Sequence, residues 1–274
     1  MKIDLHTHTN ASDSRVSREE LLRIAAAQGV ECIAITDHDT MTNSFSAFDD
    51  PVRVIRGVEL SAQVDCSNSR AHLLCYLPKD TEPLEDYFRK MREERNRNGE
   101  LMVAKVHKYF PIVDMNSVME RVGDSGTIYK LHIMRVLQDF GYTAQVYGEL
   151  YRQLFSPQIG KCFVPNRYED VDVLIERIRD ARGVVIFAHP SVYKSVKYVE
   201  HLAEMGMIDG VEIRHPKNTE VDMLDIRDFA KDYNLILTGG SDYHGGNNSR
   251  NVIVGDYCTE PDQFERLLEL SEKK

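Results

Sequence analysis

The chain has 274 residues, of which 42% are hydrophobic and 28% are charged, a composition typical of a globular protein that can bury a full core. Its net charge of −10 disfavours broad electrostatic binding of long duplex nucleic acid or of anionic membranes, but it allows a local positive site. No apolar stretch approaches the roughly 18 residues that a membrane span needs. Because the apolar run after Met1 already carries candidate ligands, we expect neither export nor a membrane anchor.

The cysteines argue against a disulfide-stabilised or thiolate-zinc protein, because their number is odd and no CxxC spacing occurs. They are Cys32, Cys66, Cys75, Cys162 and Cys258. We therefore expect a reducing, cytoplasmic location.

Seven short runs rich in Val, Ile, Leu and Tyr predict strands, and helical patterns separate most of them. The runs are Ile3–Leu5, Cys32–Ile35, Val54–Val58, Ala71–Leu77, Val184–Ala188, Gly210–Ile213 and Leu235–Leu237. Ser17 followed by Glu20 predicts a capping box that opens the first helix, which Gly29 ends. Further helices are expected over Val171–Ala181, Val199–Met205, Met223–Tyr233 and Pro261–Leu270. This alternation predicts a parallel sheet with helices outside it.

The pattern changes between about Pro78 and Lys161, where long helical segments replace the alternation. Leu84–Phe110 and Leu131–Phe140 are the clearest of these segments, and no strand is evident. We predict a barrel domain formed by residues 1–78 and 162–274, with residues 79–161 as a helical insertion that faces the substrate as a lid. The alternative is a longer connection that only packs on the outside of the barrel.

Histidines and carboxylates gather at the predicted strands, most of them at or just after the strand ends. In chain order they are His6, His8, Asp13, His38, Glu59, His72, His189, Asp242 and His244. Strand alternation points His6 and His8 the same way, into the barrel mouth that carries the active site of such folds. Nine nitrogen and oxygen ligands are too many for one ion and suit two or three. Buried carboxylates would also destabilise the fold without a cation.

Other polar residues near these strands have less direct roles. Alternation points Asp37 away from its neighbour His38. We therefore expect Asp37 either to hydrogen-bond to a metal-ligating side chain or to have a purely structural role. Glu212 and His215 face the same mouth, either as supporting or substrate contacts or as a partly exposed loop pair. His107 and His201 lie in helical segments with polar neighbours and are expected on the surface.

The motifs resemble those of the PHP family, named for polymerase and histidinol phosphatase domains. They are HxH at His6 and His8, TDH at Thr36–His38, His72 on the fourth strand, AHP at Ala188–Pro190 and SDxH at Ser241–His244. The resemblance spans Lys2 to about Gly255 and implies an α/β fold, a distorted (β/α)7 TIM-like barrel with a trinuclear metal centre.

The resemblance also implies which residues hold each ion. His6, His8, Glu59 and Asp242 would bind the first ion. Glu59, which bridges two ions, would bind the second together with His72 and His189. Asp13, His38 and His244 would bind the third. Manganese, iron and zinc all accept such ligands, so the sequence leaves the metal open.

Within the family, the helical insertion resembles that of nucleoside 3′,5′-bisphosphate phosphatases and of 5′–3′ exoribonucleases that act on short RNA. By that resemblance, Lys130, His132 and Arg135 contact the substrate phosphates. Relatives often carry arginine where Lys130 aligns, so the charge is kept but bidentate geometry is lost. The alternative for this segment is a solvated helix face. Arg95 and Arg97 are less favoured, because a mixed-charge run is usually an exposed helix.

The chemistry expected is hydrolysis by water, because no GxSxG motif, P-loop or activated Cys/His pair is evident. We predict a metal-dependent phosphoesterase in which a metal-bridged hydroxide hydrolyses phosphomonoesters of nucleotides, such as a nucleoside 3′,5′-bisphosphate. The partner would be a small phosphorylated molecule, a nucleotide or short oligonucleotide. Alternatives are 5′–3′ exoribonuclease action on short RNA, histidinol phosphatase, and a non-catalytic metal-binding module. A metal-dependent amidohydrolase is disfavoured, because His72 stands where such enzymes commonly need a carbamylated lysine or a carboxylate.

Overall fold

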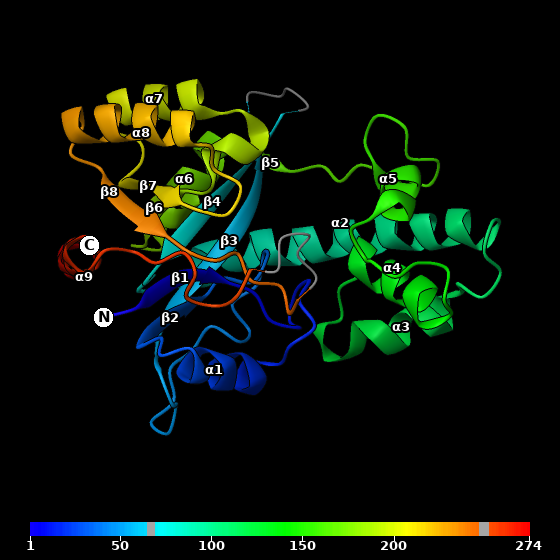
Figure 1. The fold of residues 1–274 in the computed structure, drawn as a ribbon. Coiled ribbons are helices and arrows are strands. Elements are labelled where there is room, and N and C mark those ends of the chain that lie inside the picture. Colours follow the sequence, from blue (N-terminus) through cyan, green and yellow to red (C-terminus); the bar gives the residue numbers. More distant parts are fainter. Residues whose placement is uncertain (65–68, 247–251) are drawn as a thin grey trace.

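The computed structural model describes residues 1–64, 69–246 and 252–274, and it shows a barrel-shaped sheet with helices around it (Figure 1). The strands are β1 Ile3–Thr7, β2 Cys32–Ile35, β3 Arg53–Gln63, β4 Arg70–Tyr76, β5 Glu169–Asp170, β6 Val184–Phe187, β7 Gly210–Arg214 and β8 Ile236–Gly239. They pair in the order β1-β2-β3-β4-β6-β7-β8. A bridge between Thr7 and Tyr243 brings the segment after β8 beside β1. The sheet is therefore nearly closed, and the predicted α/β barrel is confirmed.

Two features of the sheet differ from the prediction. The two-residue β5 pairs with β3 and was not predicted, since it has no apolar pattern. In addition, β4 runs antiparallel to both β3 and β6, whereas a parallel sheet was expected. The connection from Gln63 to Arg70 is too short for the crossover that a parallel pair requires. This reversal matters for the site, because it places the beginning of β4 beside the carboxyl-terminal part of β3, where His72 pairs with Ser61.

Five helices surround the barrel and close its core. They are α1 Arg18–Ala27, α6 Val171–Asp180, α7 Val196–Glu204, α8 Glu220–Asp232 and α9 Pro261–Lys273, with a short 3₁₀ segment, η2, at Pro190–Tyr193. The side chain of Ser17 accepts a hydrogen bond from the Glu20 amide, which is the Ser17 half of the predicted capping box. Phe264 and Leu267 of α9 join one apolar cluster with residues of β1, β4, β6 and β8. Both chain ends lie near this helix in Figure 1.

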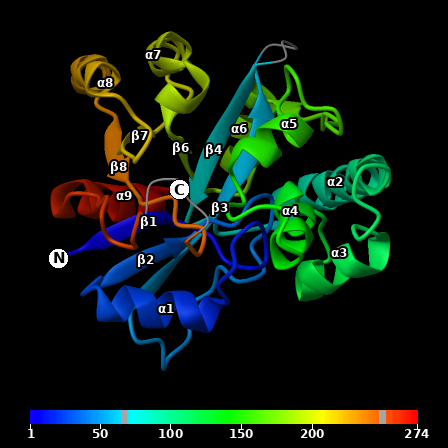
Figure 2. The same cartoon turned by 45° about the vertical axis from the view of Figure 1, so that its right-hand side comes forward.

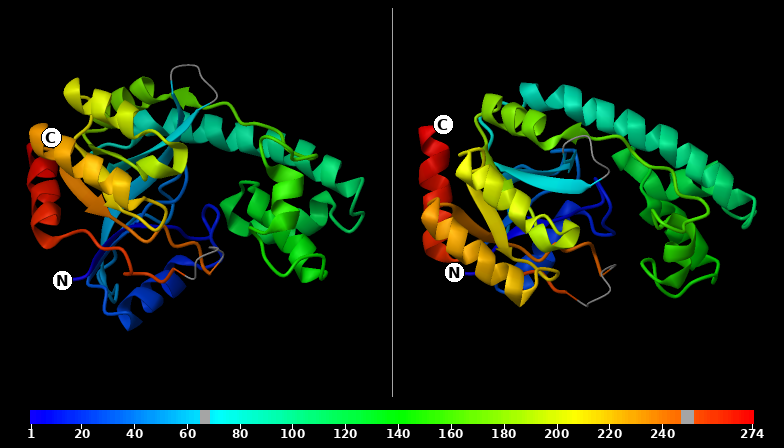
Figure 3. Two further views of the ribbon diagram at one scale, coloured as in Figure 1. Left: turned by 45° about the horizontal axis from the view of Figure 1, so that its top comes forward. Right: turned by 90° about the horizontal axis from the view of Figure 1, so that it is seen from above.

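The remaining helices form a separate group on the other side of the barrel (Figures 2 and 3). They are α2 Glu82–His107, α3 Met115–Val122, the 3₁₀ segment η1 Gly123–Ser125, α4 Lys130–Asp139 and α5 Glu149–Phe155. The first half of α2 packs Leu84 and Met91 into the barrel core, while Met102 and Val106 belong to the helical group's own apolar cluster. The helix thus spans both cores. No helix in the described ranges is both long and apolar enough to cross a membrane.

Candidate metal centre and substrate cavity

The nine predicted ligands meet at one end of the barrel, and we refer to them together as the metal cluster. They come from β1, β3 and β4 and from the segments after β1, β2, β6 and β8. His189 and Asp242 have positive φ angles, of 28° and 50°. Such backbone strain in residues other than glycine persists where the surrounding structure needs a side chain aimed in a particular direction.

Glu59 lies at the centre of the cluster, and its two oxygens face different histidines. Oε2 lies 3.2 Å from His6 Nε2, 3.3 Å from His8 Nε2 and 3.1 Å from His38 Nδ1. Oε1 lies 2.6 Å from His72 Nδ1 and 2.8 Å from His189 Nε2. A carboxylate arranged in this way can bridge two cations.

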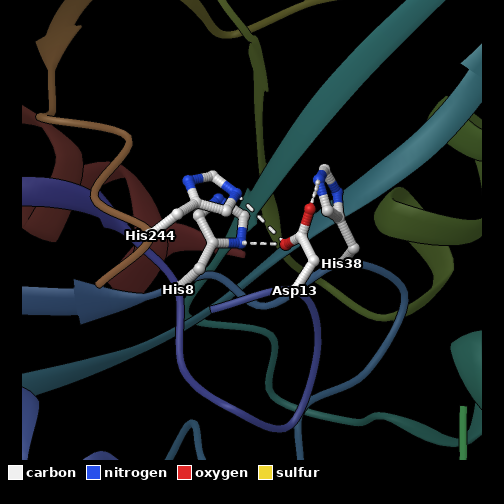
Figure 4. Close-up of side chains that lie close together, drawn as sticks. All are labelled: His8, Asp13, His38 and His244. Carbon is white, nitrogen blue, oxygen red and sulfur yellow. Dashed lines mark ion pairs between the residues drawn. The ribbon is translucent and has the colours of Figure 1, made fainter. Parts of the chain in front are cut away.

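A second carboxylate, Asp13, organises the outer part of the cluster (Figure 4). Its oxygens lie 3.1 Å from His244 Nε2 and 3.9 Å from both His8 Nδ1 and His38 Nε2. Burial by itself would raise the pKa of Asp13, but the imidazoles of His244, His38 and His8 outweigh it and lower the pKa. The imidazoles of His8 and His244 stack with their centroids 4.0 Å apart.

The ligand atoms form three compact groups, each with all its atoms within 4.8 Å of one another. The groups are His6, His8, Glu59 and Asp242; His38, Glu59 and His72; and His8, Asp13, His38 and His244. The first agrees with the set that the resemblance implied. In the second, His38 stands where the resemblance implied His189, which lies beside Glu59 but outside the compact group. In the third, His8 is added. The assignment of ligands to individual ions therefore stays a prediction.

The polar atoms of the cluster fit divalent cations. Six buried side-chain atoms of the metal cluster have no hydrogen-bond partner in the described ranges: Nε2 of His6, both ring nitrogens of His8, Nδ1 of His38, Oε2 of Glu59 and Nδ1 of His189. Burial also lowers the pKa of His38 to about 3, so this imidazole is neutral and offers a lone pair. Buried atoms of this kind are costly unless something satisfies them, and metal coordination does so.

Further buried residues hold the predicted ligands in place. His6 Nδ1 lies 2.9 Å from Glu212 Oε1, and the His189 amide donates to Glu212 Oε2 at 3.0 Å. His215 Nε2 lies 3.2 Å from Asp242 Oδ2. Both Glu212 and His215 are buried, so the geometry favours the supporting role over an exposed loop pair. Such contacts fix the orientation of ligating side chains.

Two aspartates order the loops that carry predicted ligands. Asp37 accepts hydrogen bonds from the Thr9 amide at 2.7 Å and from the Ser12 hydroxyl at 2.5 Å, so it fixes the segment between His8 and Asp13. Asp4 accepts from the amides of Ser241 and Gly255, at 2.9 and 2.7 Å. Asp4 was not predicted, although a carboxylate two residues before His6 in an apolar strand was a signal. His107 and His201 are exposed, as predicted.

A cavity of about 440 Å³ opens over the metal cluster. Its barrel side carries Arg70 and Tyr193, and its opposite wall carries Lys130, Tyr147 and Tyr151 from the helical group. The pKa of Lys130 falls to about 7, because the side chain is partly buried and lies near the cations Arg70 and Arg95. The cavity therefore joins the predicted metal ligands to a group of positive charges under an aromatic wall.

The predicted substrate residues lie in different places. Lys130 lines the cavity, whereas neither His132 nor Arg135 is among its lining residues. His132 is buried, and its Nδ1 accepts a hydrogen bond from the Tyr129 amide at the start of α4. Arg135 is partly buried, and burial together with the neighbouring Arg15 lowers its pKa. Contact of these two residues with substrate stays a prediction.

Two arginines line the cavity, although the sequence patterns disfavoured Arg95 and did not point to Arg70. Arg95 forms an ion pair with Asp39, and its guanidinium lies 4.9 Å from the centroid of the Tyr129 ring. It continues the buried face of α2 four residues after Met91, a spacing that could have revealed it. Arg70 precedes His72 by two residues on β4, so alternation places both side chains on one face.

The PHP domain family matches residues 4–183 of this chain. The chain belongs to this family. Three relatives cover most of it. It is 31% identical to the phosphoribosyl 1,2-cyclic phosphate 1,2-diphosphodiesterase of Eggerthella lenta, over 88% of this chain and 94% of the relative. It is 27% identical to the 5′–3′ exoribonuclease Rnm of Escherichia coli, over 88% and 84%. It is 25% identical to the 3′,5′-nucleoside bisphosphate phosphatase of Chromobacterium violaceum, over 91% and 90%.

A solved structure agrees with the PHP assignment. The fold superposes with a TM-score of 0.86 on a Bifidobacterium adolescentis protein assigned as a metal-dependent phosphoesterase, at 25% identity and covering 98% of this chain and 96% of the other. The chain is therefore a metal-dependent phosphoric ester hydrolase of the PHP family, and the metal cluster supports divalent ions as its cofactors.

Proposed function

We propose that this PHP protein hydrolyses a phosphomonoester of a nucleotide that carries a second phosphate, such as a nucleoside 3′,5′-bisphosphate, to give a 5′-monophosphate and inorganic phosphate. One observation carries the proposal: a single cavity joins the metal cluster to the cations Arg70, Arg95 and Lys130. A substrate with two phosphates can place one at the cluster and the other against these cations.

The nine residues of the metal cluster would hold two or three divalent ions, of manganese, iron or zinc. Such ions lower the pKa of bound water towards neutrality and neutralise charge on the phosphoryl oxygens and the leaving oxygen. The protein itself orients these ligands, through Glu212 on His6 and through His215 on Asp242. No side chain is assigned as a nucleophile.

The helical insertion, residues 79–161, would act as the lid that holds the rest of the substrate. Lys130 lies 4.7 Å from the centroid of the Phe163 ring, and His132 caps the first turn of α4 next to it. Five tyrosines line the cavity: Tyr129, Tyr147, Tyr151, Tyr168 and Tyr193. Aromatic rings of this kind stack on nucleobases, at about 1–3 kcal/mol per base.

A second candidate substrate is a phosphoribosyl 1,2-cyclic phosphate, because the relative named for it shares 31% identity. This molecule also combines a phosphate ester with a second phosphate on one ribose, but it lacks a base. The tyrosine-lined wall favours the nucleotide.

A substrate panel with added manganese tests the proposal. The panel compares adenosine 3′,5′-bisphosphate, AMP, a phosphoribosyl 1,2-cyclic phosphate, histidinol phosphate and a 5′-phosphorylated tetraribonucleotide. We expect the highest kcat/KM among the small substrates for the bisphosphate, and a loss of at least ~10-fold for Lys130→Ala, whose matched control is the exposed Lys108→Ala. Faster hydrolysis of AMP or histidinol phosphate would overturn the proposal, and a preference for the cyclic phosphate would favour the second candidate.

A further inference from the structure

A second cavity, of about 550 Å³, lies where the barrel lacks a covering helix. The connection from β2 to β3, residues 36–52, contains no helix, and residues 39–42 of this connection line the cavity. Its other wall is a face of α2, the long helix that runs from the barrel to the helical group in Figure 3. Arg56 of β3 also lines it, and alternation points this side chain away from Glu59, to the outside of the barrel.

A polar wall separates the second cavity from the metal cluster. The Tyr129 hydroxyl donates to the His38 carbonyl at 3.0 Å, and Arg95 forms its ion pair with Asp39. His38, Arg95 and Tyr129 line both cavities, so these two pairs stand between them. A ligand in the second cavity is therefore distinct from the substrate whose phosphate reaches the cluster.

Three arginines of α2 follow one another on the face that lines the second cavity. Arg89, Arg92 and Arg95 are spaced by three residues, which corresponds to ~4.5 Å along the helix axis for each step. Like charges at this spacing repel one another and disfavour the helix, so anions near them stabilise it. Carboxylates of the protein pair with Arg89 and with Arg95.

Arg92 and Arg56, by contrast, have no such partner. Both are exposed, and the described part of the chain provides no ion pair for either. The residues that stand three and four positions away from Arg92 on α2 are Phe88, Arg89, Arg95 and Asn96. None of these is acidic, although glutamate is frequent in the rest of the helix. Two guanidiniums of the cavity are thus left without a counter-ion in the described ranges.

The other lining groups suit an anion that carries several phosphates. Hydroxyl donors come from Thr40, Thr42, Thr81, Ser125 and Thr127. Four arginines stand against three carboxylates, so the lining is positive in a chain whose net charge is −10. Guanidinium and hydroxyl groups both donate to phosphate oxygens, and arginines about one helical turn apart can each contact a different phosphate of one chain.

We infer that the second cavity binds a short chain of phosphates, either as an inorganic di- or triphosphate or as part of a nucleoside di- or triphosphate, with Arg56 and Arg92 as its main contacts. The ligand is bound there and not hydrolysed, because the metal cluster lies on the other side of the polar wall. Binding in the second cavity therefore does not depend on the proposed function.

The test compares the double variant Arg56→Ala/Arg92→Ala with the control Arg53→Ala/Arg97→Ala. The control removes two arginines from the same strand and the same helix, and neither lines the second cavity. Isothermal titration calorimetry uses the manganese-loaded full chain and methylenediphosphonate, a diphosphate analogue whose P–C–P bridge resists hydrolysis. Excess magnesium keeps the probe from removing manganese.

We expect wild type and control to bind two equivalents of methylenediphosphonate, one at the metal cluster and one in the second cavity, with Kd values that agree within about twofold. The double variant should lose the second equivalent or bind it at least ~10-fold more weakly. Methylphosphonate, which has a single phosphonate group, should bind the second cavity at least ~10-fold more weakly than methylenediphosphonate. Tighter binding of the β,γ-methylene analogue of ATP would identify a nucleoside triphosphate as the ligand, and equal or weaker binding would identify the inorganic ion.

Chemical modification gives a second readout, which locates the site. Phenylglyoxal modifies accessible arginines, and mass spectrometry identifies the modified residues. Methylenediphosphonate should protect Arg92 of the wild-type protein and leave Arg97 reactive.

Four results would overturn the inference. The first is a single bound equivalent in wild type, and the second is a second equivalent that the double variant keeps unchanged or that the control loses equally. The third is methylphosphonate binding as tight as that of methylenediphosphonate, and the fourth is equal protection of Arg92 and Arg97. Failure of the wild-type protein to hydrolyse the bisphosphate would instead reject the proposed function and would leave these measurements valid.

Discussion

Glu59 connects the parts of the metal cluster, because each of its oxygens faces a different set of imidazoles. Glu212 has a different role, since it touches His6 and the His189 amide but lies outside the three compact ligand groups. The two carboxylates are both buried and chemically identical, so substitutions at them separate bridging of cations from support of ligands.

We predict that Glu59→Gln impairs metal binding more than Glu212→Gln does. Glu59→Gln removes the bridging charge and should abolish binding of at least one metal ion per chain. Glu212→Gln should keep the ions but weaken their affinity by about 10–100-fold, as is typical for a supporting residue. Elemental analysis after gel filtration, together with titration of manganese, measures both quantities. Full metal content in Glu59→Gln would contradict the bridging role.

Lys130 gives a prediction about pH. Its pKa of about 7 means that the free enzyme loses this charge as the pH rises through 7, and a neutral amine attracts phosphate less. We therefore expect kcat/KM for the bisphosphate, which reports on the free enzyme, to fall above pH 7. Lys130→Arg should move the fall to higher pH, because a guanidinium stays charged.

The control for this pH dependence is p-nitrophenyl phosphate, which has no second phosphate. On that substrate, wild type and Lys130→Arg should have superimposable pH profiles. A bisphosphate profile that is the same in both proteins would show that Lys130 does not hold the second phosphate.

At the scale of elements, α2 is joined to the barrel by one buried polar network. Asp39 accepts hydrogen bonds from the Ser61 amide at 2.8 Å and from the Tyr87 hydroxyl at 2.8 Å, and it pairs with Arg95. Burial alone would raise the pKa of Asp39, but Arg95 outweighs it and lowers the pKa. Because Asp39 follows His38 directly, the network also fixes the position of a predicted ligand relative to the helical group.

We predict that Arg95→Ala lowers the free energy of unfolding by about 3–5 kcal/mol, since it leaves the Asp39 carboxylate buried without its partner. The double variant Arg95→Ala/Asp39→Asn should recover part of this loss, because the uncompensated charge is gone. Urea unfolding of the two single variants, the double variant and wild type completes the cycle. Losses that simply add would mean that the ion pair does not couple α2 to the barrel.

The strands show which features of the fold could be predicted from the sequence. Apolar runs located all seven of the longer strands, because burial on a sheet requires such runs whatever the strand direction. The direction of β4 depended on the length of its connection to β3, which the alternation of helices and strands does not report. The two-residue β5 is fixed only by its pairing with β3, so no local pattern predicts it.

Across the whole molecule, the meeting of the nine predicted ligands could be expected from the sequence, because each stands on or beside a strand and a barrel brings such positions together. The cations of the cavity were harder to predict. Arg70 and Arg95 belong to segments that meet only through tertiary packing. A second cavity is lined by α2 and by the segment after β2, and no periodic pattern in the sequence indicates that these two segments lie side by side.

This arrangement also links metal binding to global stability. The ligands run from His6 to Asp242 and His244, so bound ions would join the first strand to the segment after the last one. Several nitrogen and oxygen atoms of the cluster are buried without hydrogen-bond partners in the described ranges, and bound ions would satisfy them. An ion that binds only the folded chain stabilises it by mass action, by about 2.7 kcal/mol at 100 times its Kd.

We therefore predict that chelation lowers the Tm by at least ~5 °C and that manganese restores it. Differential scanning calorimetry with and without EDTA measures the shift. His8→Ala, which removes a side chain shared by two of the three ligand groups, serves as the comparison. Its Tm should respond to EDTA much less than that of wild type, because fewer ions remain to be removed. An equal response in both proteins would place the stabilising ion away from the metal cluster, and no response in either would mean that the ligands do not hold the barrel closed through a metal.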